Sequence, residues 1–171
     1  MVFTHTLLSA TSETPASVTY ARATRSDRLP FLKLLLRERL NFLTPYVCDV
    51  EKCVVVARDI SSGALIGGAK LGRMENTDKE TYQLSSVVVD QAYRSQGIGK
   101  ALIQRALDLA PSKDATVFLT TLADRETLYS PFGFRVATDA DEPVPASLQL
   151  EMCVGAVLFS AASLIVMVRR N

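Results

Sequence analysis

The fold is decided by one stretch, Val87-Val88-Val89-Asp90-Gln91-Ala92-Tyr93-Arg94-Ser95-Gln96-Gly97-Ile98-Gly99-Lys100-Ala101-Leu102. Here an apolar strand runs into a turn with two glycines, and a helix follows at once. Glycine lets the backbone approach a ligand closely, and the first amides of a helix have no partner within the helix. The stretch therefore predicts an anion site for a phosphate or a pyrophosphate.

Single residues exclude two common phosphate motifs. A P-loop requires a glycine where Arg94 stands and a hydroxyl where Ala101 stands. A dinucleotide-binding fingerprint requires a third glycine at the position of Leu102. It also requires an acidic residue at the end of a second strand, but the next acid, Asp108, falls within the predicted helix.

The stretch resembles the acetyl-CoA-binding motif of the GNAT N-acetyltransferase superfamily, Val-x-x-x-x-Arg-x-x-Gly-x-Gly-x-x-Leu. The matching residues are Val89, Arg94, Gly97, Gly99 and Leu102. The resemblance implies a mixed α/β fold with a twisted, mostly antiparallel sheet of six to seven strands flanked by helices. It also implies that the fourth and fifth strands, here residues 82–89 and 116–122, splay apart around the pantetheine arm of acetyl-CoA.

The same resemblance assigns the cosubstrate site. Backbone groups of the three valines would hold the acetyl and pantetheine groups, amides of residues 95–100 would bind the pyrophosphate, and Arg94 and Lys100 would add Coulomb attraction. The predicted acetyl-CoA-binding residues are Val87, Val88, Val89, Arg94, Ser95, Gln96, Gly97, Ile98, Gly99 and Lys100.

Tyr129 is the predicted catalytic residue. The segment from Leu128 to Phe134 resembles the family's Tyr-x-x-x-Gly-Phe segment, whose tyrosine hydroxyl lies near the thioester sulphur. A phenol of pKa about 10 stays protonated at neutral pH and can donate its proton to a thiolate whose own pKa is about 8.5. We therefore predict Tyr129 as the general acid, with packing against Phe132 as the alternative role.

Two departures from the family pattern limit this assignment. Leu122 stands where many relatives have an asparagine that contacts the pantetheine. Where some relatives have a glutamate base, the fourth strand offers only Gln83, Ser85 and Ser86. The base is therefore unassigned. Carboxylates that can reach the acceptor pocket are Glu75, Asp124, Glu126 and Glu151, and each is typical of a solvated charge.

Composition narrows the class of protein further. A chain of 171 residues predicts one domain, and we divide it into a flexible arm at residues 1–17 and a single N-acetyltransferase domain at residues 18–171. The net charge of +1 favours no nucleic-acid partner. The only histidine, His5, lies in the arm, so we expect no metal site.

The three cysteines lack zinc or redox spacing and predict buried or half-buried thiols, which fits a reducing compartment. We expect the cytoplasm, because the arm has neither the arginines of a transit peptide nor the apolar core of a secretory signal.

Outside the motif, the pattern predicts a strand at residues 18–23 and a hairpin of residues 53–58 and 64–71. A helix begins near Thr24, which forms a capping box with Asp27, and Pro30 would kink or restart it. Its predicted buried stripe consists of Leu29, Leu32, Leu36, Leu40 and Leu43. A short helix is expected at residues 124–132.

Residues 152–168 carry no charge and raise the alternative of a membrane anchor. As a helix they would span about 25 Å, short of the roughly 30 Å hydrocarbon core. We favour instead an amphipathic helix at about residues 145–159 and a final strand at residues 163–168, which completes the sheet that the family fold requires. We therefore expect no membrane partner.

The resulting functional hypothesis is an acetyl-CoA-dependent N-acetyltransferase. A small-molecule or peptide amine would attack the thioester directly in a ternary complex. The acceptor class stays open between a protein N-terminus, a lysine, a polyamine, an arylalkylamine and an antibiotic, and the protein is expected to be a monomer or a homodimer. The alternative is a catalytically weak acetyl-CoA-binding regulator of the same fold.

Overall fold

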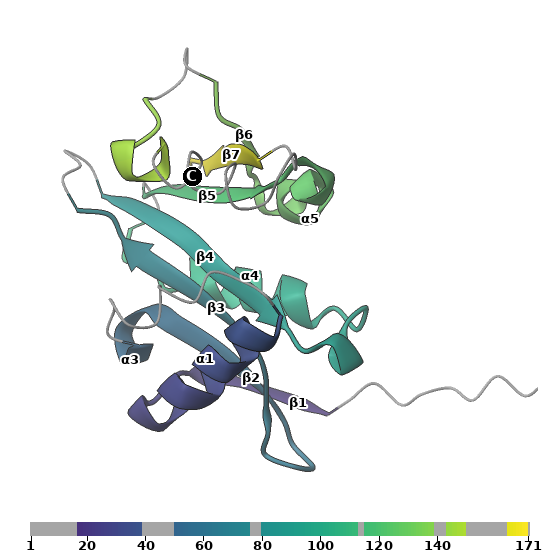
Figure 1. Cartoon of the computed structure of the whole chain (residues 1–171). Coiled ribbons are helices and arrows are strands. Elements are labelled where there is room, and N and C mark those ends of the chain that lie inside the picture. Colours follow the sequence, from purple (N-terminus) through teal and green to yellow (C-terminus); the bar gives the residue numbers. More distant parts are fainter. Residues whose placement is uncertain are drawn as a thin grey trace, which may run out of the picture.

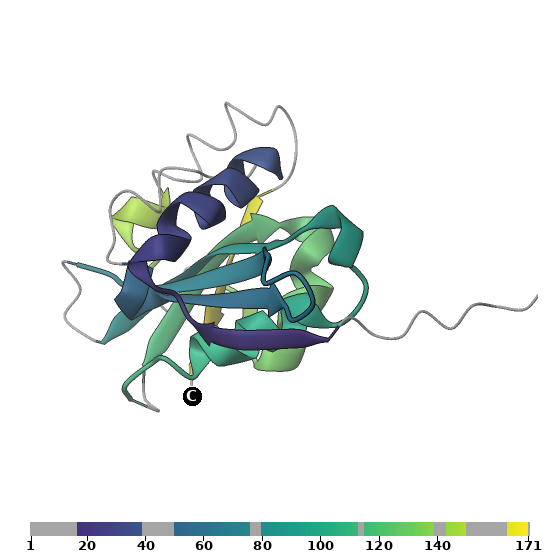
Figure 2. The same cartoon turned by 90° about the horizontal axis from the view of Figure 1, so that it is seen from below.

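The computed structural model describes residues 17–38, 50–75, 80–112, 115–138, 143–149 and 164–170. Within these ranges one seven-stranded sheet carries helices on both faces (Figures 1 and 2). The strands are β1 (Val18–Arg22), β2 (Val54–Asp59), β3 (Leu65–Arg73), β4 (Thr81–Val89), β5 (Thr116–Leu122), β6 (Arg135–Val136) and β7 (Leu164–Arg169). The α-helices are α1 (Arg28–Arg37), α3 (Val50–Cys53), α4 (Ile98–Leu107) and α5 (Glu126–Tyr129), with a further helical turn at residues 146–149.

The strand order in the sheet is β1-β2-β3-β4-β5-β7-β6. All neighbouring pairs are antiparallel except β4 and β5, which are parallel. The predicted fold class is confirmed, as are the hairpin of β2 and β3 and the strands that became β4 and β5. The predicted arm at residues 1–17 lies outside the described residues except for Ser17.

The last described strand, β7, lies inside the sheet between two other strands. Residues 164–169 form β7, which pairs with β5 on one side and β6 on the other. A single membrane-spanning helix over residues 152–168 is therefore wrong, because residues 164–168 form a strand of the sheet, in which Val166, Met167 and Val168 are buried. In the described part of the chain, no helix is both long and apolar enough to cross a membrane. Most of the predicted helix at 145–159 lies outside the described residues.

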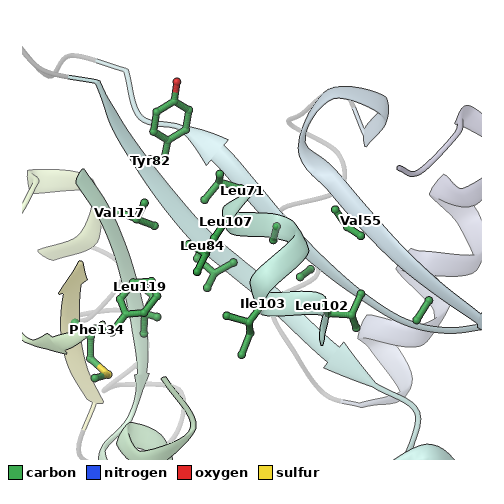
Figure 3. Packing of buried hydrophobic residues seen from close by; sticks show 14 of the residues in the cluster. Val55, Leu71, Tyr82, Leu84, Leu102, Ile103, Leu107, Val117, Leu119 and Phe134 are labelled. Carbon is green, nitrogen blue, oxygen red and sulfur yellow. The ribbon is translucent and has the colours of Figure 1, made fainter. Parts of the chain in front are cut away.

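Two neighbouring glycines in β3 let a helix approach each face of the sheet. A Cβ built on Gly67 would lie 3.0 Å from Leu102 Cδ1 of α4, and one on Gly68 would lie 2.5 Å from the Phe31 ring of α1. Since successive residues of a strand face opposite sides, α4 and α1 cover opposite faces. The cluster under α4 includes Leu102, Ile103, Leu84 and Val117 and is drawn in Figure 3.

The buried face of α1 only partly matches the predicted one, since Leu32 is buried as predicted but two other leucines of the stripe are exposed. Leu29 and Leu36 are 65% and 49% exposed, whereas Phe31, Leu34 and Leu35 are buried together against β2 and β4. The ring of Phe31 covers Gly68, and the i, i+3, i+4 spacing places Leu34 and Leu35 beside it. The predicted stripe followed leucine spacing and left out this phenylalanine. Leu40 and Leu43 lie outside the described residues.

The predicted capping box is confirmed at the entry to α1. The backbone N–H of Thr24 donates to Asp27 Oδ2 at 2.8 Å, and a 3-10 turn over Arg25–Asp27 precedes α1. Pro30 falls in the first turn of α1, where its missing N–H interrupts no helix hydrogen bond. Asp27 is 2% exposed and forms an ion pair with Arg58 of β2.

We expect Asp27→Asn to lower the free energy of unfolding by about 2 kcal/mol, because Arg58 loses its charged partner in a largely buried site and the cap is weakened. Urea unfolding at pH 7 measures the change. The matched control is Asp124→Asn, because the Asp124 side chain is 71% exposed. This substitution should lower the free energy of unfolding by under about 0.5 kcal/mol. Equal effects of the two substitutions would contradict the stabilising role of the pair.

Candidate functional site

The strands β4 and β5 pair for only a short distance and then separate. Residues Thr81–Gln83 pair with Thr116–Phe118, after which β4 stays paired with β3 as far as Val89 and β5 with β7 as far as Leu122. The two ribbons diverge in Figures 1 and 3. The facing edges of both strands therefore carry backbone groups without a strand partner, as the predicted splay requires.

A bulge lies on the free part of β4. Gly68 pairs with Val88 and Lys70 with Ser85, so β4 holds one residue more than β3 between these pairs. At the bulge Ser86 has φ of 53°, a conformation that costs a non-glycine residue about 1–2 kcal/mol. Bulges recur beside active sites, where they redirect neighbouring groups.

Beyond the bulge, the three valines alternate between the two faces of the sheet. Val88 is buried under α1, whereas Val87 and Val89 pack against the cluster under α4. Their side chains serve the core. On the edge that does not face β3, the backbone of β4 has no strand partner at these positions, and its predicted role in holding acetyl-CoA stays a prediction.

The turn after β4 leads directly into the first turn of α4. Ser95 and Gly97 both have positive φ, of 63° and 78°. The N–H of Ala101 donates to Gly97 O at 3.1 Å, so the amides of residues 98–100 precede the helical hydrogen bonds. A Cβ on Gly99 would meet nothing nearer than Val89 Cγ2 at 3.8 Å, and one on Gly97 nothing within 4 Å. Free amides, open space and the positive end of the helix dipole together suit an anion.

The side chains of the turn contribute less than its backbone. Ser95, Gln96 and Lys100 are exposed, and Ile98 is 3% exposed and packs in the core. The Nε–H of Arg94 donates to Val89 O at 3.1 Å, and its guanidinium pairs with Glu38 at the end of α1. The Arg94 side chain is thus engaged within the protein. Its predicted attraction to phosphate stays a prediction.

Tyr129 lies at the end of α5 beside β5. Burial raises the pKa of its phenol, and a hydrogen bond with the Thr121 hydroxyl opposes that rise without cancelling it. The ring contacts Phe134 edge-to-face, with centroids 6.2 Å apart. Thr121 lies in the part of β5 that no longer pairs with β4, so the phenol lies beside the part of β5 that has separated from β4. The position suits a proton donor that is protonated at neutral pH.

No described carboxylate stands out as a base. Glu75, Asp124 and Glu126 are exposed, and Glu151 lies outside the described residues. Gln83 and Ser85 are half-buried on β4. Among the described residues there is no group of three His, Cys, Asp or Glu side chains that could hold a metal ion.

Two buried hydroxyls in the described part of the chain lack any hydrogen-bond partner, namely Ser86 Oγ on β4 and Thr120 Oγ1 on β5. Unsatisfied buried polar atoms are rare and call for an explanation. Both lie on the diverging parts of the two strands. Thr120 was not among the predicted residues, because a threonine inside an apolar strand carries no sequence signal until the splay is known.

A hydrogen bond between Tyr93 and Asp59 also holds the segment before the turn, and it was not predicted from the sequence. Asp59, at the β2–β3 turn, accepts hydrogen bonds from the Ser61 N–H at 2.9 Å and from the Tyr93 hydroxyl at 3.1 Å. Hydrogen bonds from the Ser61 amide, from the Ser62 and Ser61 hydroxyls and, least of all, from Tyr93 lower the pKa of Asp59, and the bond to Asp59 raises the pKa of Tyr93. The 3-10 turn before Arg94 is thereby fixed to a hairpin 34 residues away in sequence.

The lowered pKa values of Asp27 and Asp59 predict how stability depends on pH. For Asp27, burial raises the pKa, but the Thr24 amide and Arg58 outweigh it. A carboxylate with a lowered folded-state pKa stabilises fully above its unfolded pKa, near 3.8 here, and ever less as pH falls through the lower folded value. We expect the urea midpoint to be flat from pH 7 to 5 and to fall below pH 4.

The double variant Asp27→Asn/Asp59→Asn tests which groups cause this fall. At pH 7 its urea midpoint should be lower than that of the wild type. Between pH 5 and pH 3 its midpoint should fall by less than that of the wild type. An acid-induced loss of the same size in both proteins would assign the pH dependence to other carboxylates.

A sheet that splays between two parallel strands, with a turn of free amides and a helix after the first of them, is typical of the class of acyl-CoA-binding transferases. The chain belongs to the acetyltransferase (GNAT) family, whose model matches residues 20–134. Acetyl-CoA is the acetyl donor of this family, so the predicted family and cosubstrate are confirmed.

Individual relatives agree with this assignment. The N-alpha-acetyltransferase RimI of Mycobacterium tuberculosis is 33% identical over 78 residues, which are 44% of this chain and 48% of that protein. The matches span about half or less of the length of the curated relatives.

Solved structures share the fold. Rv2747 of Mycobacterium tuberculosis, in complex with CoA, has a TM-score of 0.64 at 23% identity, covering 90% of this chain and 99% of that one. The ribosomal-protein-S18-alanine N-acetyltransferase of Escherichia coli also has a TM-score of 0.64, at 18% identity, covering 90% of this chain and 93% of that one.

Proposed function

We propose that the protein transfers the acetyl group of acetyl-CoA to a primary amine, with both substrates bound at once. The observation that carries this proposal is the gap between β4 and β5. At the end of β4 lies a turn whose free amides suit an anion, and the Tyr129 hydroxyl lies beside β5. The β4 side of the gap would thus bind the cosubstrate, and the β5 side would supply a proton donor.

The residues around the gap fit such a cosubstrate. The open space beside Gly97 and Gly99 and the amides of residues 98–100 suit a diphosphate. The free edge of β4 offers backbone groups to the amides of a pantetheine arm. The orphaned hydroxyls of Ser86 and Thr120 would gain hydrogen-bond partners from a polar chain, or from ordered water, in the gap.

In the proposed acetyl transfer, backbone groups stabilise charge and one side chain donates a proton. Acetyl-CoA supplies a thioester whose carbonyl carbon accepts the amine and whose sulphur leaves as a thiolate. Backbone N–H groups near Val87 and Val89 would stabilise the negative charge that develops on the carbonyl oxygen. Tyr129 would give its phenolic proton to the sulphur as the carbon–sulphur bond breaks.

The acceptor nitrogen must be neutral to attack. Because Glu75, Asp124 and Glu126 are exposed, we assign the base role to none of them. We propose instead that water carries the ammonium proton to bulk solvent. The rate should then fall at low pH mainly because the acceptor amine becomes protonated, with a midpoint set by the pKa of that amine.

Acetyl-CoA is expected to raise the melting temperature of the protein by mass action, by an amount that grows with ligand concentration. The same samples should release free thiol when an acceptor amine is added. No thermal shift at millimolar acetyl-CoA would contradict the proposal. A shift without thiol release from any amine would support the alternative of a catalytically weak binder.

The acceptor panel follows from the proposed chemistry and from the relatives. Because RimI is an N-alpha-acetyltransferase, a peptide with a free α-amino group comes first. The same peptide with a blocked N-terminus and one lysine separates the α-amino from the ε-amino class. Free amino acids and diamines represent small-molecule acceptors.

A further inference from the structure

The end of α1 is joined to the stretch between β4 and α4 by charged side chains. Arg37 pairs with Asp90, the first residue after β4, and Glu38 pairs with Arg94 at the start of the turn. Arg37 Nε also lies 3.4 Å from Glu38 Oε1. The two pairs link positions that are 53 and 56 residues apart in sequence. Arg37, Glu38 and Asp90 line part of an open hollow of about 460 Å³.

Burial indicates that the Glu38–Arg94 pair is more than a surface contact. The Glu38 side chain is 9% exposed, in contrast to Arg25–Glu51, where the side chains are 90% and 42% exposed. The Arg94 side chain is 52% exposed, so the pair is desolvated on the side of the carboxylate alone, and the enclosed carboxylate has charged partners in Arg94 and Arg37. Arg94 is held in addition by its bond to Val89 O.

The pair acts next to a strained position of the turn. Ser95, with φ of 63°, follows Arg94 directly. Such a conformation persists only where the surroundings fix it. Arg94 is fixed to α1 on one side and to the end of β4 on the other. The clamp formed by Glu38 and Arg94 is therefore one of the contacts that fix the backbone between the end of β4 and the first turn of α4.

We propose that Glu38 and Arg94 are positioning residues for acetyl-CoA, which preorganise the diphosphate-binding turn through their mutual ion pair rather than through contact between Arg94 and the phosphates. This proposal rests on the proposed function. It assigns the anchoring of the phosphates to the backbone and gives the end of α1 a role in cosubstrate affinity. A turn that is already ordered loses less entropy on binding.

The test is a double-mutant cycle on the Kd for CoA, measured by calorimetry well below the melting temperature. Glu38→Gln and Arg94→Gln should each weaken CoA binding by about three- to thirtyfold, the range typical of coupling through a structural network. The double variant should bind no more weakly than the poorer single variant, since both substitutions break one interaction. Glu38→Asp should restore part of the affinity, and the control Glu51→Gln should leave it unchanged.

The alternatives give different results. If Arg94 instead binds phosphate directly, Glu38→Gln frees it and tightens CoA binding, which would overturn the proposal. If the pair only stabilises the fold, Glu38→Gln lowers the melting temperature and leaves the Kd of the folded protein unchanged, which would also overturn it. A wild-type protein that binds no CoA would contradict the proposed function itself, whereas the other outcomes bear on the clamp alone.

Discussion

Tyr129→Phe should lower kcat by about a hundredfold or more, the contribution usual for a general acid, while the Kd for CoA changes by less than about twofold. The substitution removes only the phenolic oxygen. The ring keeps its edge-to-face contact with Phe134, so the packing of α5 on the sheet is preserved. The thiolate would then leave without a proton, and the loss falls on the chemical step.

A thiol-release assay at saturating acetyl-CoA and acceptor measures this effect. The matched control is Tyr20→Phe on β1, whose ring lies under Arg105 at 4.1 Å and keeps that contact as phenylalanine. It should retain full activity. A Tyr129→Phe enzyme with kcat near that of the wild type would show that the tyrosine is a packing residue and that another group protonates the sulphur.

Gly99→Asp should raise the Kd for CoA more than about a hundredfold, since a carboxylate there occupies the open space and repels the diphosphate. The folded protein should nevertheless be as stable as the wild type or slightly more so. Gly99 lies in the first turn of α4 with nothing nearer to its Cβ position than 3.8 Å. An aspartate in a first helical turn stabilises the helix by roughly 0.3–1 kcal/mol.

Because Gly99→Asp should weaken CoA binding without destabilising the fold, a loss of affinity cannot be attributed to unfolding. Gly99→Ala separates size from charge and should give an intermediate loss of affinity. Gln104→Glu, which adds the same charge further along α4, should change the Kd by less than about threefold. If Gly99→Asp bound CoA normally, the first turn of α4 would not be the phosphate site.

The sequence predicted the parts of the molecule that depend on local patterns. The apolar runs of β2 and β3, the capping box of Thr24 and Asp27, and the two glycines of the turn each leave a signal within a few residues. The backbone half of the candidate site could be predicted for the same reason. Its geometry follows from a strand, a turn and a helix that are contiguous in sequence.

What the sequence could not predict depends on contacts between distant residues. The buried face of α1 is set by Phe31 against Gly68, and leucine spacing does not reveal that contact. Arg94 belongs to the motif, but its partner Glu38 looks like an ordinary surface charge until the fold places the two together. The bulge at Ser86 has no glycine to mark it.

The most direct test of the acetyl-CoA site is the amide NMR spectrum of the protein during titration with acetyl-CoA. If the cosubstrate lies between β4 and β5 with its diphosphate on α4, the amide signals of Val87, Val89 and residues 98–100 should move most. Signals of β1 (Val18–Arg22), on the far edge of the sheet, should stay in place. Saturating acetyl-CoA that moves other signals and leaves those of β4 and α4 unchanged would contradict this location.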